Sequence, residues 1–102
     1  MKKIADISEK IINTIREAEE NALFAIEYKA IDRPLADAAW TISNQLLGHV
    51  DIWHAQEVRM IKDEQSKGKE PPAGMMKVYE FQHKREMDAV TRVKFMLDEY
   101  KK

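Results

Sequence analysis

Apolar residues recur at helical spacing along almost the whole 102-residue chain, and only two stretches interrupt the pattern. The first is Asp-Arg-Pro at 32–34, and the second is the Pro- and Gly-containing stretch 67–74. Proline lacks an amide hydrogen and keeps its predecessor away from helical angles, so each stretch should end a helix. The spacing therefore predicts three long helices, at about 4–31, 35–66 and 75–100.

Two short connections between long helices place sequence neighbours antiparallel. We therefore predict an all-α fold, in which residues 1–102 form one domain, an antiparallel three-helix unit with up-down topology. Three helices bury a modest core, and pairing with a second copy is a common way to cover the remaining apolar surface. We expect a homodimer that closes a larger bundle.

Composition narrows the possible functions. The 17 basic and 18 acidic residues are interspersed, so the basic stripe typical of nucleic-acid-binding proteins is missing. The sequence has no cysteine, which excludes disulfides, thiolate metal sites and a cysteine nucleophile and fits a cytoplasmic protein. Its start lacks the apolar segment of a signal peptide, and no apolar run approaches the roughly 20 residues that span a bilayer. We expect neither nucleic acid nor membrane as a partner.

Each predicted helix carries an apolar face that should form the core. In the first helix this face comprises Ile4, Ile7, Ile11, Ile15, Ala18, Ala22 and Ile26. In the second it comprises Ile42, Leu46, Val50, Trp53 and Ile61, and in the third Met75, Tyr79, Val90, Val93 and Leu97. Polar residues that rarely lie inside without partners fall among these positions: His49, His54, Glu57, His83 and Glu86.

The pattern His-x-x-Glu occurs twice, at His54–Glu57 and at His83–Glu86. Residues three apart share one face of a helix. If the second and third helices are antiparallel about a loop near residue 70, His54 lies level with Glu86, and Glu57 with His83. The two pairs should then meet as a compact quartet across the helix pair.

Two imidazoles and two carboxylates suit a divalent ion such as Zn, Ni, Fe or Mn, and the imidazoles argue against a Ca or Mg site. An alternative is two crossed His–Glu hydrogen-bonded pairs that satisfy each other without an ion and only fix the register of the helices. His49 lies roughly a turn and a half before His54 on the second helix, near the expected level of Glu19 on the first helix. A third hypothesis is a ferritin-like di-iron site, completed by dimerisation and by Glu19.

The stretch 31–56, IDRPLADAAWTISNQLLGHVDIWHAQ, resembles the DinB/YfiT-like superfamily of helical bundles. The resemblance rests on Pro34, on Trp40 followed by Thr-Ile, and on the Leu-x-x-His pattern that ends at His49. The resemblance implies a metal-dependent and often dimeric bundle, in which His49 is one of three metal-binding histidines. The superfamily includes thiol transferases and hydrolases. The other two belong to a His-x-x-x-His motif in a fourth helix, and no such motif occurs in this sequence.

The leading hypothesis is therefore a small metal-binding helical protein of unassigned activity. Its candidate ligands are His49, His54, Glu57, His83 and Glu86. A non-enzymatic interaction or structural module is the main alternative.

Overall fold

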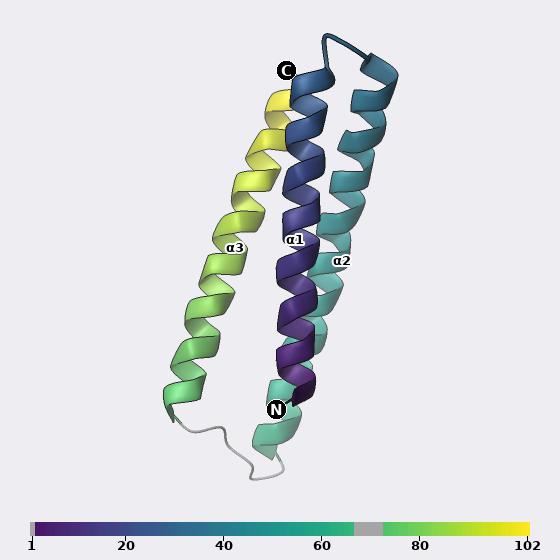
Figure 1. The fold of residues 1–102 in the computed structure, drawn as a ribbon. Helices are drawn as coiled ribbons and strands as arrows, with labels where there is room; N and C mark the ends of the chain where they lie inside the picture. The colour runs from purple at the N-terminus through teal and green to yellow at the C-terminus, as the bar shows by residue number, and fades with distance from the viewer. Residues whose placement is uncertain (1, 67–72) are drawn as a thin grey trace.

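The computed structural model describes residues 2–66 and 73–102, with the side chains of 2–5, 64, 65, 73–76, 78 and 79 left out of the description. These residues form α1 (Lys2–Tyr28), α2 (Arg33–Ser66) and α3 (Ala73–Lys101), and the two described ranges contain no strand. The helices run up, down and up, so sequence neighbours are antiparallel (Figure 1). The all-α prediction is confirmed, and the molecule is elongated, 56 by 18 by 17 Å.

The helix boundaries differ from the predicted ones by a few residues, for local reasons. α1 ends at Tyr28, earlier than predicted, because the backbone amides of Ile31 and Asp32 both turn back to its carbonyl oxygen. Asp32 then caps α2, since its carboxylate accepts a hydrogen bond from the Leu35 amide at 3.2 Å. α3 already includes Ala73 and Gly74, which were expected in the loop. The rest of that expected loop, residues 67–72, lies outside the described residues.

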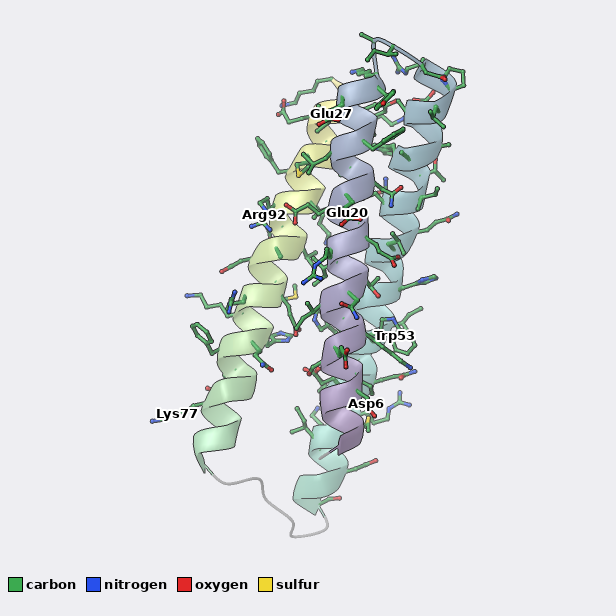
Figure 2. All side chains as sticks on the ribbon, in the orientation of Figure 1. Asp6, Glu20, Glu27, Trp53, Lys77 and Arg92 are labelled. Atoms are coloured by element: carbon green, nitrogen blue, oxygen red, sulfur yellow. The ribbon has the colours of Figure 1, made fainter. Side chains whose placement is uncertain are left out.

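α1 is the central helix of the three. It packs against both α2 and α3, whereas α2 and α3 contact each other least (Figure 1). Charged residues such as Asp6, Glu20 and Glu27 of α1 lie on the outer surface (Figure 2). The main core joins all three helices and contains Ile11, Ile15, Ala18, Ala22, Leu47, Val50, Val90, Val93 and Leu97.

Two residues predicted for the core are exposed instead. Ile26 is 42% exposed, and Ala25 takes the buried position on α1. At 3.6 residues per turn, Ala25 is rotated by only about 20° from Ala18, whereas Ile26 is rotated by about 80°. In α2, Ile42 is 45% exposed and Ser43 is fully buried. The predicted positions Ile4, Met75 and Tyr79 lie outside the described side chains.

Ser43 is tolerated inside because its hydroxyl has a partner. It donates a hydrogen bond of 2.7 Å to the carbonyl oxygen of Ala18 in α1. Small residues on the facing helices, Ala18 and Ala22 in α1 and Ala39 in α2, are buried here and let the two backbones approach closely. This close approach rotates α2 by about one residue position from the predicted orientation, so that Leu47 and His54 are buried while Leu46 and Trp53 are half-buried.

Large apolar residues remain exposed on each helix. On α2 they include Leu35, Ile42 and Ile52, and on α3 Phe81 and Phe95. The homodimer expected from the sequence stays a prediction, since the structure contains one chain. None of the described helices combines the length and the apolar character needed to cross a bilayer.

A group of polar contacts joins the end of α3 to the start of α2. The Tyr100 hydroxyl donates a hydrogen bond to Asp37, and Arg33 donates one to the same carboxylate at 3.1 Å. Trp40 adds a hydrogen bond of 3.0 Å from its indole nitrogen to the carbonyl oxygen of Leu97. The hydrogen bond from Tyr100 is the main cause that lowers the pKa of Asp37, while burial is the main cause that raises the pKa of Tyr100.

These shifts predict a loss of stability at both ends of the pH range. A lowered pKa in the folded state means that the ionised Asp37 stabilises the fold above its unfolded pKa of about 3.9, and that this contribution is lost as the pH falls further. A raised pKa means that the neutral Tyr100 contributes fully below its unfolded value of about 10, and that this contribution is lost as the pH rises further. Tyr100→Phe should remove both contributions.

The measurement is the free energy of urea unfolding between about pH 2 and pH 11, compared between the parent protein and the Tyr100→Phe variant. The difference between the two should be largest near neutral pH and should shrink toward both extremes. Tyr28→Phe is the matched control, because the described residues offer the Tyr28 hydroxyl no hydrogen bond and its ring stacks on Phe24. A Tyr100→Phe profile that stays parallel to the parent profile would contradict the prediction.

Candidate metal centre

Three potential metal ligands come together between α2 and α3. His54 comes from α2, and His83 and Glu86 come from α3, one turn apart on the same face. Each of the three offers one ligand atom, and these atoms all lie within 4.8 Å of one another. We call this group the His–Glu cluster.

The buried part of the His–Glu cluster is the contact between His54 and Glu86. Nε2 of His54 lies 3.0 Å from Oε2 of Glu86, which is hydrogen-bond distance. The two side chains are only 11% and 4% exposed. His54 and Glu86, which the antiparallel register predicts to lie level with each other, are thus in direct contact.

His83 forms the open side of the cluster. It is exposed, and its ring lies 5.0 Å from the ring of His54, centroid to centroid, with an angle of 64° between the ring planes. An exposed imidazole can change its side-chain rotamer at little cost, whereas the buried pair is held by its surroundings. The cluster therefore combines two fixed ligands with one adjustable ligand that water reaches.

Glu57 has a different partner from the expected one. It is buried, and it accepts a hydrogen bond of 2.9 Å from the hydroxyl of Ser8 in α1, where the sequence argument placed His83. Sequence reasoning did not consider Ser8 as a site residue. The sequence feature that could have identified Ser8 is its position three residues before Ile11, which places its hydroxyl on the apolar face of α1. The antiparallel register that joins Ser43 to Ala18 also brings Ser8 to within about one turn of Glu57.

His49 and Glu19 do not join the cluster. His49 is exposed on α2, and Glu19 accepts an ion-pair hydrogen bond of 3.1 Å from Arg92 of α3 (Figure 2 labels Arg92). Arg92 lies almost two turns along α3 from Glu86. The α1 carboxylate needed by the ferritin-like alternative is therefore directed to another partner in this arrangement.

The arrangement supports two kinds of role. Two imidazole nitrogens and a carboxylate oxygen are a suitable donor set for a divalent transition ion. The same contacts also satisfy the buried polar groups without an ion, since no buried side-chain nitrogen or oxygen among the described residues lacks a hydrogen-bond partner. The cluster is therefore compatible with metal binding and with a purely structural pairing.

Comparison of the chain with models of known families, with curated proteins and with solved structures finds no match. The resemblance to the DinB/YfiT-like superfamily accordingly stays a prediction from the stretch 31–56.

Proposed function

We propose that this protein binds one divalent transition-metal ion through His54, His83 and Glu86. The observation that carries the proposal is the convergence of three ligand atoms of suitable type within 4.8 Å of one another, from two helices and next to solvent. A tetrahedral ion with bonds of about 2.0–2.1 Å separates its ligands by roughly 3.3 Å. The 3.0 Å separation of His54 and Glu86 is close to that value, and a rotation of the exposed His83 supplies the third ligand.

Three protein ligands leave a coordination position for water or for a ligand molecule, which is the arrangement of catalytic rather than structural zinc sites. The two imidazoles favour Zn, Ni, Fe or Mn over Ca or Mg. When bound, such an ion polarises an oxygen or activates a water molecule or thiol. The protein residues hold the ion between α2 and α3, and Ser8 keeps the carboxylate of Glu57 turned toward α1.

The test is elemental analysis of untagged protein, followed by calorimetric titration of the metal-free protein with Zn²⁺. We expect near-stoichiometric binding. His54→Ala or His83→Ala should lower the affinity for Zn²⁺ by more than about 100-fold, because losing a residue that only hydrogen-bonds a ligand already costs about 10- to 100-fold. His49→Ala is the matched control and should leave the affinity unchanged, because His49 is an exposed histidine of α2 outside the cluster.

Two outcomes would overturn the proposal. In the first, the metal-free protein takes up none of Zn²⁺, Ni²⁺, Fe²⁺ and Mn²⁺. In the second, His49→Ala weakens binding as strongly as His54→Ala, which would move the ion to the position that the family resemblance implies.

The second candidate function is a non-enzymatic helical module. It is supported by the complete pairing of the buried polar groups in the described residues, which needs no ion. In that case the His54–Glu86 contact specifies the register of α3 on α2, a role known for buried polar pairs. The expected homodimer would then supply the interaction surface.

A further inference from the structure

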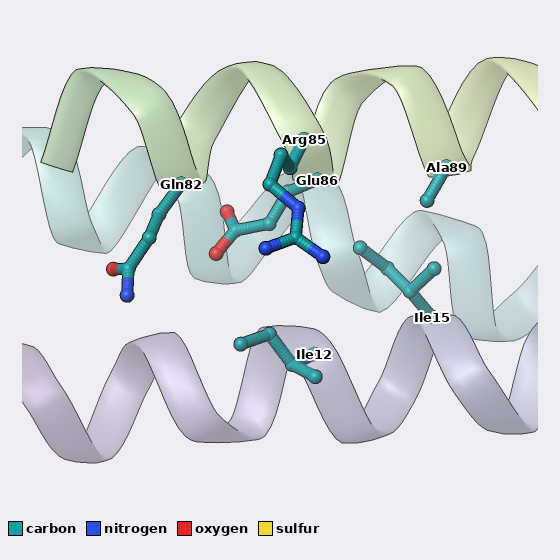
Figure 3. Close-up of a pocket in the computed structure, with 6 residues that line it drawn as sticks. All are labelled: Ile12, Ile15, Gln82, Arg85, Glu86 and Ala89. Atoms are coloured by element: carbon teal, nitrogen blue, oxygen red, sulfur yellow. The ribbon is translucent and has the colours of Figure 1, made fainter. Parts of the chain in front are cut away.

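A cavity lies between α1 and α3, next to the His–Glu cluster. Its volume is about 230 Å³. The wall formed by α1 is apolar, whereas the wall formed by α3 carries the polar side chains and one alanine (Figure 3). The lining residues are Ile12, Ile15, Gln82, Arg85, Glu86 and Ala89. Since a cavity of about 150 Å³ accommodates benzene, this one has room for a ring with a small substituent.

Arg85 gives the cavity a chemical preference. Figure 3 shows its side chain reaching from α3 into the space above Ile12 of α1. No carboxylate among the described side chains lies within ion-pair distance of this guanidinium. The guanidinium carbon lies 5.8 Å from the centre of the Phe81 ring, a contact that helps to orient it. A planar guanidinium binds a carboxylate through two parallel hydrogen bonds, so the cavity favours an organic acid.

The same cavity shares a residue with the proposed metal site. Glu86 lines the cavity, and its Oε2 atom points to His54 at 3.0 Å. Its negative charge is therefore directed toward the imidazole and, in the proposed function, is compensated by the ion. The amide of Gln82 adds a neutral hydrogen-bond donor on the same helix face. A molecule held by Arg85 would lie next to Glu86, one of the proposed metal ligands.

We infer that the cavity binds a small carboxylate with an apolar or aromatic body, and that this is the substrate class of the metal site. Arg85 holds the carboxylate, and Ile12, Ile15 and Ala89 contact the apolar part. The claim that the ligand is a substrate rests on the proposed function. The binding itself does not, since Arg85 and the apolar walls are present with or without the ion.

The experiment is a titration of metal-free and Zn²⁺-loaded protein with benzoate, followed by the amide signals in ¹H–¹⁵N spectra. We expect saturable binding that shifts the signals of Ile12, Gln82 and Ala89. Arg85→Met should weaken it at least about tenfold, as expected for lost charge-assisted hydrogen bonds, while benzamide should bind more weakly than benzoate. Arg92→Met, an exposed arginine of α3 that pairs with Glu19, is the control and should bind like the parent protein.

The outcomes separate this inference from the proposed function. Equal binding of benzoate by the parent protein and by Arg85→Met overturns the inference and leaves metal binding untouched. Shifts of the same signals that depend on protein concentration instead of benzoate also overturn it, because a second copy of the chain then fills the cavity. Arg85-dependent binding to a protein that takes up no metal ion supports the carboxylate site and overturns its assignment as a substrate site.

Discussion

Replacing His54 by Leu should lower the free energy of unfolding by about 1–3 kcal/mol in metal-free protein, the cost of leaving a buried hydrogen-bonding group without its partner. The reason is that Glu86 stays buried between the helices without the imidazole that it contacts at 3.0 Å. Urea unfolding followed by circular dichroism measures the change. The exposed His49 supplies the control, since His49→Leu should stay within about 0.5 kcal/mol of the parent protein.

The double variant His54→Leu/Glu86→Met should recover most of this loss. Replacing both partners of a buried hydrogen bond by apolar side chains of similar shape leaves no buried polar group without a partner, and can be nearly neutral or stabilising. The predicted destabilisation by His54→Leu would be contradicted if this variant unfolds at the same urea concentration as His49→Leu. In that case the pair would be solvated in the folded protein.

The same variants distinguish the two proposed roles. Saturating Zn²⁺ at 100 times its dissociation constant should stabilise the parent protein by about 2.7 kcal/mol, because the ion binds the folded state alone. The double variant should gain nothing from Zn²⁺. If the parent protein also gains nothing, the pair serves only to align α2 and α3.

Ile11→Ala should destabilise the protein by about 2–5 kcal/mol, the range for removing the large side chain of a buried residue. Ile11 is 0% exposed and contributes to the core shared by all three helices. Neighbouring side chains of an elongated bundle can only partly fill the space that it leaves. The measurement is again the free energy of unfolding in urea.

Ile42→Ala is the informative control for this variant. The apolar pattern of the sequence places Ile42 in the core, whereas the structure leaves it 45% exposed, so the substitution should cost less than about 1 kcal/mol. A loss of stability as large as that of Ile11→Ala would show that Ile42 is more buried in solution than it is in the single chain. It would mean that a second copy covers this face of α2, and a concentration-dependent unfolding midpoint would then accompany it.

The parts of the structure that follow from local chemistry agree closely with the sequence predictions. The Asp-Arg-Pro stretch lies at the boundary between α1 and α2, where Asp32 caps α2, and α2 ends at Ser66, directly before the Pro- and Gly-containing stretch. It was also predictable that His54 and Glu86 lie at the same height along the helix pair, because the rise per residue is the same in both helices and the connection between them is short. These features depend on residues close in sequence or on simple counting along a helix.

The rotation of each helix about its axis was harder to predict. Ile42 is more apolar than Ser43, yet Ser43 is buried because α1 approaches α2 closely along small residues and offers the Ala18 carbonyl oxygen as a partner. The same rotation turns Glu57 toward Ser8 and leaves His49 outside the cluster. Apolar periodicity identifies a broad face of the helix, and a rotation of one residue within that face changes which polar groups meet.

The amino-acid order therefore specified three antiparallel helices and the level at which the histidines and glutamates of α2 and α3 meet, because helical pitch and proline stereochemistry act locally. Helix packing selected the members of the His–Glu cluster, paired Glu57 with Ser8, and opened the cavity beside Arg85. These outcomes depend on contacts between residues tens of positions apart, whose strength is set by side-chain volume and hydrogen bonding across the interface between helices.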